Sequence, residues 1–413
     1  MISKNNNHTE CFIWIWLPEQ ITPVVAGKIA LAENKYCFTY SQSYRARSDA
    51  IALSAFELPL QSGTFVPTGM NDIHSCLRDA SPDAWGRRLI HYQHPTLNAN
   101  EIDFLLLSGS NRIGALDFQA SSEAYISREN KLDNMSVIDD LASIIESNKQ
   151  FSPELIPALL HGTSIGGARP KCTLEKAGKN CIAKFSLSTD LYPIIKFEYI
   201  AMKLAKQIGI DVANVEYISA HGRDILLIER FDRTRNKNGW QRHNILSGLS
   251  LLGLNEMEAR YASYRDLADI IRQHFFKPQK TLEELFKRLV FNIICGNTDD
   301  HARNHSALWD GNHLVLSPAY DLCPQLRTGQ EATQAMAIGG SEGNFSTLTN
   351  ALSIHDKFLL NLQYAKDIIN MQLEQTQKYW PLLCEEVELS AAEQKMLWGN
   401  VICSDYCLLK WAS

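Results

Sequence analysis

The sequence lacks the hydrophobic runs that direct a chain into or across a membrane. No apolar run reaches the roughly eighteen residues that a membrane span needs. The start of the chain, Met1–Glu10, is polar, and no apolar segment follows a basic stretch, so a standard export signal is not expected. We therefore expect a cytoplasmic protein with no membrane partner.

The sequence also lacks paired cysteines. Its 10 cysteines include no CxxC pair and are scattered through a chain that is large enough to fold without disulfides. We interpret them as reduced thiols. Cys403 and Cys407, with His residues elsewhere, could form part of a metal site, but no second pair of ligands accompanies them.

The chain has no strong excess of one charge and no internal repeat. It carries 40 Lys and Arg against 46 Asp and Glu, a net charge of −6, unlike a disordered acidic chain or a basic nucleic-acid coat. No repeat of about 20 to 50 residues occurs, which excludes solenoids and propellers. With 413 residues, of which 45% are hydrophobic, the chain can fill two or three packed cores.

The first half of the chain combines strand and helix patterns. Residues Cys11–Tyr40 are rich in Ile, Trp, Val, Phe and Tyr and are interrupted by Pro and Gly, which is typical of short antiparallel strands. Strands are also expected over 181–185 and 224–228, with a helix over 195–208 between them. The polar stretch Ser121–Asn134 is the best candidate for a domain boundary.

The second half has mainly helical patterns. Thr281 and Glu284 are spaced as in a capping box, and apolar residues follow on one helical face until Gly296. This helix leads directly into the polar segment Asn297–His305. A mixed lobe followed by a helical lobe is therefore expected.

The spacing of Asp299 and Asn304 is the most informative feature of the polar segment. Phosphoryl transfer to a hydroxyl needs a carboxylate that accepts the proton and oxygen ligands that hold Mg²⁺ against the phosphates. Kinase catalytic loops place Asp and Asn five residues apart, as here. Asp321, which follows a short strand-like run, could supply a second metal ligand.

Two other interpretations of this segment stay open. Asn and Asp are common in solvated loops because their side chains satisfy turn amides. His301 and His305 are four residues apart and flanked by carboxylates, as on the zinc-binding helix of a metal hydrolase. The glutamate of H-E-x-x-H is missing, however, and the stop at Gly296 argues against a helix there.

A kinase also needs a cation on the phosphates. Lys184 lies in the strand-like run Ile182–Phe185, and Glu198 lies on the helix that follows, as in the lysine and glutamate pair of kinases. Lys196 competes for this role, but it lies at the start of the helix rather than in a strand. An ordinary exposed ion pair is the alternative interpretation of Lys184 and Glu198.

Two loops could contact a nucleotide. Ser164–Lys171 is a small-residue loop whose backbone amides could approach phosphates, although it matches no standard glycine-rich motif and Pro170 removes one donor. Glu229–Phe231 follows a strand, where backbone groups could reach adenine and Phe231 could offer an apolar face. Plain turns are the alternative interpretation of both loops.

Taken in this order, the segments resemble the HipA family of bacterial serine/threonine kinases, the toxin halves of HipBA-type toxin–antitoxin modules. Ser81–Arg88 is also similar to a segment of that family's N-terminal domain, so the resemblance covers most of the chain. The other matching stretches are Ser164–Lys171, Ile182–Phe185 with Glu198, Glu229–Arg233, Asn297–Asn304 and Tyr320–Asp321.

The resemblance implies a role for each motif. Asp299 would be the catalytic base, and Asn304 and Asp321 would be Mg²⁺ ligands. Lys184, oriented by Glu198, would hold the ATP phosphates. Ser164 would be an autophosphorylation site whose modification ejects its loop and silences the enzyme. The other nucleotide-binding residues that it implies are Gly166, Gly167, Ala168, Arg169, Pro170, Lys171, Glu229, Arg230, Phe231, His301, Ala302, Arg303 and Tyr320.

The chain departs from the family's pattern at two places. Asp300 stands where Gly is expected and adds a charge beside the proposed base. The glycine-rich stretch Gly339–Gly343 lies in a long gap that has no interpretation. Neither departure removes a required group.

The fold implied by the resemblance is α+β and kinase-like, with two lobes: an N-terminal mixed α/β lobe with small antiparallel sheets and a C-terminal all-helical lobe. Residues 1–125 would form a HipA N-terminal-like domain, residues 126–234 a nucleotide-binding mixed lobe with the phosphate loop, and residues 235–413 the mainly helical catalytic lobe.

The expected function is that of an ATP- and Mg²⁺-dependent protein serine/threonine kinase. Its substrate would be a translation-related protein such as an aminoacyl-tRNA synthetase. Its partner would be a helix-turn-helix antitoxin, through which any DNA binding would come. The alternative is a catalytically silent kinase-fold binding module that acts as a corepressor or partner-binding protein.

Overall fold

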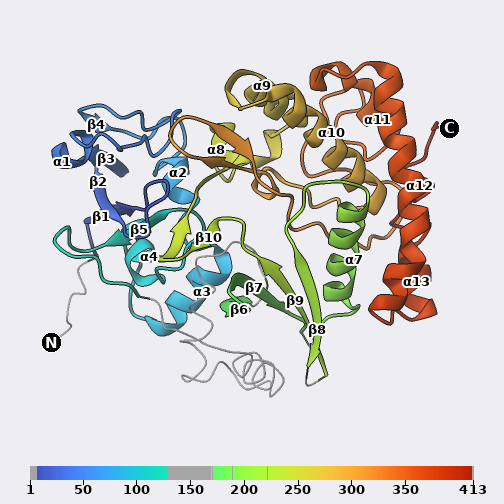
Figure 1. Cartoon of the computed structure of the whole chain (residues 1–413), viewed down its shortest axis with the longest axis horizontal. Helices are drawn as coiled ribbons and strands as arrows, with labels where there is room; N and C mark the ends of the chain where they lie inside the picture. The colour runs from blue at the N-terminus through green and yellow to red at the C-terminus, as the bar shows by residue number, and fades with distance from the viewer. Residues whose placement is uncertain (1–6, 129–168, 170, 188, 221, 412–413) are drawn as a thin grey trace. The chain divides into compact units, whose positions relative to one another are not determined.

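The structure is a computed structural model that describes residues 7–128, 169, 171–187, 189–220 and 222–411 (Figure 1). It confirms a mixed α/β fold with small antiparallel sheets, and the chain divides into two compact units. Unit 1 comprises Met1–Ser188, Ser219–Leu246 and Leu308–Asn312, and unit 2 comprises Thr189–Ile218, Ser247–Ala307 and His313–Ser413.

The first sheet of unit 1 confirms the strands expected within Cys11–Tyr40. Its order is β4-β3-β2-β1-β5, and its neighbouring strands pair antiparallel. A Cβ at Gly27 would lie 2.2 Å from the carbonyl oxygen of Thr39, so this position in β2 excludes any side chain. The strands are β1 (Glu10–Ile15), β2 (Val24–Ala32), β3 (Lys35–Tyr40), β4 (Thr64–Phe65) and β5 (Leu116–Gln119), and the helices of this region are α1 (Gln42–Arg45), α2 (Ser75–Arg78), α3 (Ala84–Gln93) and α4 (Glu101–Leu107).

The second sheet contains the other two predicted strands. Its order is β6-β7-β9-β8, and β7 pairs antiparallel with both β6 and β9. The hairpin β10–β11 follows β9 along the chain. The elements are β6 (Lys171–Lys176), β7 (Lys179–Phe185), β8 (Val215–Ala220), β9 (Arg223–Glu229), β10 (Arg233–Asn236) and β11 (Gly239–Arg242).

The last segment of unit 1, Leu308–Asn312, packs on residues near the start of the chain. The indole Nε1 of Trp309 donates to the carbonyl oxygen of Ala52 at 2.8 Å. Gly311 has a left-handed backbone, and a Cβ there would lie 2.3 Å from a methyl carbon of Ile51. Unit 1 is therefore completed by residues from the second half of the sequence.

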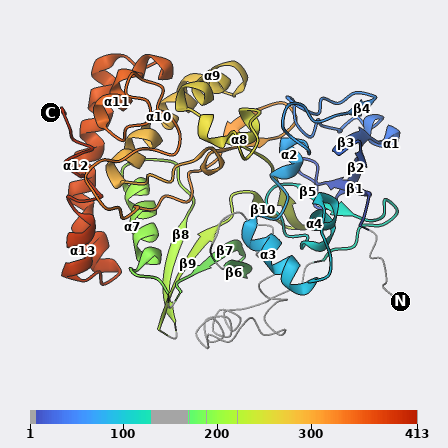
Figure 2. The ribbon, with the colours of Figure 1, turned by 180° about the vertical axis from the view of Figure 1, so that it is seen from behind.

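Unit 2 is mainly helical, and α7 lies beside α12 in both views (Figures 1 and 2). The helix expected over 195–208 is α7, and the hydroxyl of its Tyr199 donates to Glu386 of α12 at 2.5 Å. The α-helices are α7 (Ile194–Gln207), α8 (Gly248–Leu251), α9 (Tyr264–His274), α10 (Pro278–Cys295), α11 (Leu348–Ser353), α12 (Leu362–Glu386) and α13 (Ala391–Leu397).

An all-helical second half of the chain is not confirmed, because residues 235–413 also contain strands. In addition to β11, three short strands form a sheet in the order β12-β13-β14. They are β12 (Asn244–Ser247), β13 (Ser306–Trp309) and β14 (Leu314–Leu316), and the short 3-10 helices are η1 (Ala259–Tyr261), η2 (Ala302–Asn304) and η3 (His355–Phe358).

Helix α10 ends where the sequence predicts but begins earlier. Its first residue is Pro278, whose fixed φ suits the first helical position, so the expected cap at Thr281 is wrong. Thr281 lies inside the helix, and its hydroxyl donates back to the carbonyl oxygen of Lys277 at 3.2 Å. At the other end Gly296 takes the left-handed conformation, with φ 69°. The predicted apolar face is buried, namely Leu282, Leu285, Phe286, Leu289, Val290, Ile293 and Ile294.

Two further expectations can be compared with the structure. All ten cysteines are free, which confirms the interpretation as thiols. No helix in the described part of the chain combines the length and the apolar character needed to cross a bilayer.

The turn at Gly296 generates a stability prediction. A Cβ at Gly296 would lie 2.6 Å from the carbonyl oxygen of Val401, so Gly296→Ala adds a clash to the strain of a left-handed backbone. We expect a loss of about 2–5 kcal/mol in the free energy of unfolding, measured in urea. Gly253→Ala is the matched control, because Gly253 has φ 68° and open space around it. Strain alone should cost about 1–2 kcal/mol there, and equal losses in the two variants would contradict the clash.

Candidate active site

The loop after α10 brings Asp299 and Asn304 together. The side-chain nitrogen of Asn304 donates to the carbonyl oxygen of Asp299 at 3.1 Å, and Asn304 lies in η2, which closes the loop. The loop is also tied to the chain beyond β14, because the backbone N–H of Ala335 donates to the carbonyl oxygen of Thr298 at 3.0 Å. The two residues that the sequence spacing selects therefore share one compact loop.

Asp321 lies near this loop. The hydroxyl of the preceding residue, Tyr320, donates to the carbonyl oxygen of Arg303 at 2.6 Å, and Asp321 itself has a left-handed backbone with φ 59°. Burial raises the pKa of the Asp299 carboxyl above its ordinary value. His301 opposes this shift, whereas the negative charges of Asp321 and Asp300 raise the pKa further. Asp299 and Asp321 are therefore close enough to repel each other.

The donors in this loop suit a hard cation. Because the nitrogen of the Asn304 amide is engaged with Asp299, its carboxamide oxygen is directed away from that bond. Together with the Asp321 carboxylate it provides oxygen ligands of the kind that Mg²⁺ takes, with the remaining positions left to water or phosphate. These residues therefore fit a magnesium ion.

The alternative metal sites are not formed. Within the described residues, no group of three or more His, Cys, Asp and Glu side chains could hold a metal ion. Nε2 of His305 lies 2.9 Å from Asp300 and is engaged with that carboxylate. The zinc site with His301 and His305 and the metal site with Cys403 and Cys407 are thus not supported.

Asp300 belongs to a buried polar network. One carboxylate oxygen lies 2.9 Å from Nε2 of His305, and the other accepts from the hydroxyl of Tyr264. That hydroxyl accepts from the side chain of Asn292 at 3.2 Å, and Asn292 accepts from Asn297 at 3.0 Å. All five side chains are buried. The expected charge beside Asp299 is present and acts on its pKa, but its oxygens are held in the interior.

This network fixes the loop at both ends. Asp300 follows Asp299 directly, and His305 follows Asn304, so the contact between Asp300 and His305 joins the neighbours of the two candidate residues. Sequence reasoning missed it because Tyr264 is remote in the sequence from its partners, Asp300 in the loop and Asn292 in α10.

The predicted phosphate-binding lysines face each other across β6 and β7. Lys171 and Lys184 are direct antiparallel partners, so their side chains lie on the same face of the sheet. Lys171 is buried, with its Nζ 3.7 Å from the carboxylate of Asp83, which also caps α3. The two lysines thus place two cationic groups on one face of the sheet, with the carboxylate of Asp83 beside Lys171.

The remaining predicted residues lie in different parts of the structure. Glu229 ends β9 and is half-buried, as is Phe231, whereas Arg230 between them is buried. Lys184 belongs to unit 1 and Glu198 to unit 2, so their pairing stays a prediction. Arg169 is half-buried. Ser164, Gly166, Gly167, Ala168 and Pro170 lie outside the described residues.

Two family profiles match the chain. The HipA N-terminal domain matches residues 16–119, and the HipA-like C-terminal domain matches residues 163–380. Because the second match alone covers more than half of the sequence, the chain belongs to the HipA family.

Curated relatives support the same family. "Putative kinase Y4mE" of Sinorhizobium fredii is 35% identical over 142 residues, which is 32% of this chain and 34% of that protein. "Serine/threonine-protein kinase toxin HipA" of Shewanella oneidensis is 31% identical over 186 residues, which is 38% of this chain and 42% of that protein. The matches thus span between about a third and two fifths of the relatives' length.

A solved structure shows a similar fold. The HipA chain of the Shewanella oneidensis complex of HipA, HipB and operator DNA matches with a TM-score of 0.68. The match covers 91% of this chain and 92% of that chain at 19% identity. At this identity the likeness establishes the fold alone.

The network around Asp300 generates a second prediction. Tyr264→Phe removes one partner of a buried carboxylate, so we expect the free energy of unfolding to fall by about 1–3 kcal/mol in urea denaturation. Tyr364→Phe is a matched control, since its hydroxyl donates to Glu283 from an exposed position. That variant should change stability by less than about 0.5 kcal/mol. Similar effects in both would refute the importance of the buried contact.

Proposed function

We propose that the protein is an ATP- and Mg²⁺-dependent protein serine/threonine kinase of the HipA type. The observation that carries the proposal is the loop in which Asn304 bonds to the backbone of Asp299 while Asp321 acts on the Asp299 charge. One carboxylate for the proton and two oxygen ligands for the metal are what phosphoryl transfer to a hydroxyl needs.

In this proposal, Asp299 accepts the proton of the substrate hydroxyl, and its raised pKa makes it a better base than an exposed aspartate. Asn304 and Asp321 hold the metal. Bound Mg²⁺ would neutralise phosphate charge and orient the phosphates. The remaining contribution of the chain is positioning, which supplies much of the rate enhancement in phosphoryl transfer.

The nucleotide would be held by residues of unit 1. Lys171 and Lys184 would contact the phosphates from one face of the sheet, and Glu229–Phe231 would contact adenine. The predicted contact of Glu198 with Lys184, the two-lobed arrangement and the three domains with boundaries near residues 125 and 234 are parts of the same proposal. The proposal also includes nucleotide contacts by the loop that contains Arg169.

The biological role that we propose is that of a toxin. One relative is named a kinase toxin, and the solved HipA structure is a complex with HipB and operator DNA. By analogy, the substrate would be a translation-related protein, and a helix-turn-helix antitoxin would bind this chain and carry any contact with DNA. Autophosphorylation of Ser164 would silence the enzyme.

The first test removes the proposed base. Asp299→Asn keeps the shape of the side chain, and we expect phosphate transfer from labelled ATP to fall by about 10²–10⁴-fold. Stability should not fall, because the change removes repulsion from Asp321 and Asp300. Asp269→Asn, in a surface ion pair with Arg272, is the control and should keep full activity. No transfer by the wild-type protein would favour the catalytically silent binding module instead.

The second test concerns the metal. Asp321→Asn removes a charge, but Asn tolerates the left-handed backbone at φ 59°, so the loop should keep its conformation. We expect ATP affinity in saturating Mg²⁺ to fall by about tenfold, which corresponds to about 1.4 kcal/mol. Affinity without Mg²⁺ should stay the same. An unchanged magnesium dependence in a titration of ATP binding would remove Asp321 from the metal site.

A further inference from the structure

The connector between β9 and β10, Glu229–Arg233, combines buried charged residues with half-buried ones. Arg230 and Asp232 are buried, whereas Glu229 and Phe231 are half-buried. Phe231 and Asp232 form a turn between the two strands. The buried charged side chains of this connector are fixed in the interior, directly beside the residues proposed to contact adenine.

Two buried arginines of the connector, Arg230 and Arg233, donate to the loop Asn111–Gly114, which we call the clamp loop. Arg230 donates to the side-chain oxygen of Asn111 at 2.7 Å and to the carbonyl oxygen of Arg112 at 2.6 Å. Arg233 donates to the same Arg112 carbonyl at 2.5 Å and to the carbonyl oxygen of Gly114 at 2.9 Å. The clamp loop thus supplies acceptors for both arginines that flank Asp232.

Asp232 completes this arrangement. Its carboxylate pairs with both Arg230 and Arg233 at 2.7 Å and accepts from the backbone N–H of Gly114 at 2.8 Å. Burial by itself would raise the pKa of Asp232, but the two arginines and the Gly114 N–H hold it well below its usual range. Asp232 therefore remains charged. Its bonds to both arginines and to Gly114 hold the connector and the clamp loop in one relative position.

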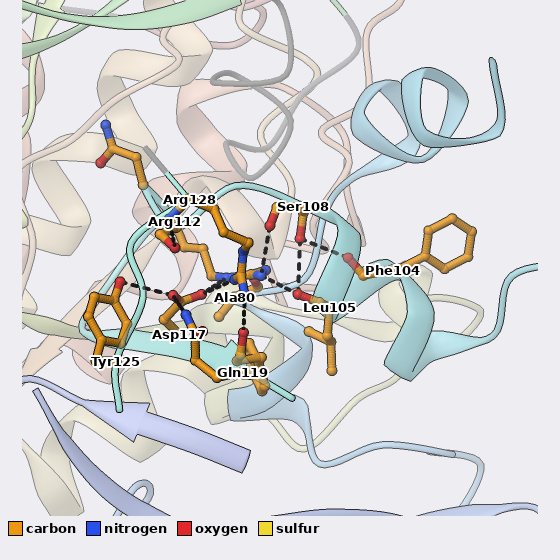
Figure 3. Close-up of polar contacts among 12 residues, drawn as sticks. Ala80, Phe104, Leu105, Ser108, Arg112, Asp117, Gln119, Tyr125 and Arg128 are labelled. Carbon is orange, nitrogen blue, oxygen red and sulfur yellow. Dashed lines mark hydrogen bonds and ion pairs between the residues drawn. The ribbon is translucent and has the colours of Figure 1, made fainter. Parts of the chain in front are cut away.

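The clamp loop is itself anchored in the N-terminal region (Figure 3). The guanidinium of Arg112 is fully buried, pairs with Asp117 of β5 at 2.8 Å and donates to the carbonyl oxygens of Ala80 and Leu105. Figure 3 shows these partners around the guanidinium, with Arg128 also on Asp117. Arg112 thereby links the first sheet of unit 1 to the connector: its side chain pairs with Asp117 of β5, and its carbonyl oxygen accepts from Arg230 and Arg233.

A further bond reaches the second sheet. The side-chain nitrogen of Asn111 donates to the hydroxyl of Thr173 in β6 at 3.0 Å. β6 also carries Lys171, one of the two lysines proposed to hold phosphate. One short loop from the N-terminal region therefore contacts both β6 and the connector, which carry residues of the proposed nucleotide site.

We propose that the clamp loop and Asp232 are positioning elements of the nucleotide site, and that they set the orientation in which Glu229–Phe231 meets adenine. This inference rests on the proposed function. Buried ion pairs contribute little net stability compared with apolar packing, but they fix one arrangement of the groups that they join. The N-terminal region is thus part of the nucleotide site rather than a separate module.

The test measures binding and catalysis separately in the full-length protein. Asn111→Ala removes one acceptor of Arg230 and the bond to Thr173, and Asp232→Asn removes the central charge. For each variant we expect the Kd and KM for MgATP to rise by about tenfold, as the loss of a charge-assisted hydrogen bond implies, with kcat within about threefold of wild type. The preference for ATP over GTP should also fall, which a loss of stability alone does not produce.

Glu101→Gln is the control variant. It weakens the Arg87–Glu101 pair of unit 1, in which Arg87 also donates to Pro82 and Ser81 rather than to the clamp loop, so MgATP affinity and nucleotide preference should equal those of wild type. If Asp232→Asn does not fold, the nucleotide affinity and preference of Asn111→Ala alone test the inference. Unchanged nucleotide affinity and preference in folded clamp variants would overturn the inference. A wild-type protein that binds MgATP but transfers no phosphate would overturn the proposed function, whereas the inference about the clamp loop would still hold.

Discussion

A charged side chain that is buried loses its contacts with water and needs hydrogen-bond or ion-pair partners in their place. This constraint applies in both units of the protein. In unit 1, Asp232 is enclosed by Arg230, Arg233 and the backbone of Gly114. In unit 2, Asp300 is enclosed by Tyr264 and His305. Each cluster lies directly beside residues proposed to act in phosphoryl transfer. Because a buried charge has few acceptable positions, the neighbouring backbone has few as well.

The catalytic loop of unit 2 and the lysine-bearing face of unit 1 are held by different contacts. The catalytic loop is closed by bonds within unit 2, so Asp299 and Asn304 keep their spacing without a ligand. In unit 1, Lys171 and Lys184 lie opposite each other on one face of the sheet, and Asp83 pairs with Lys171. In unit 2, Asp299 and Asp321 repel each other, and a bound cation would reduce this repulsion.

Local patterns in the sequence predicted much of the fold. Alternating and helical periodicities located the strands within Cys11–Tyr40 and the helix α7, and the spacing from Asp299 to Asn304 identified a loop that the structure confirms as compact. The capping pattern at Thr281 does not mark the start of α10, because Pro278, whose fixed φ suits the first helical position, begins the helix four residues before the start that this cap implies. The clusters around Asp300 and Asp232 could not be predicted. Their members lie up to about a hundred and twenty residues apart, and no periodicity connects a loop arginine with an acceptor at that separation.

The segment Leu308–Asn312, which packs on Ile51 and Ala52, also bears on how the protein is made. A ribosome that adds about 5–20 residues per second needs roughly 13 to 52 s to go from Ala52 to Asn312. Until then the N-terminal part of the chain lacks the strand residues that complete unit 1. Contacts between such distant residues also slow folding after synthesis. Truncated chains released before this point would carry an unfinished unit 1, so a nascent fragment cannot assemble the complete fold before the catalytic loop has itself been synthesised.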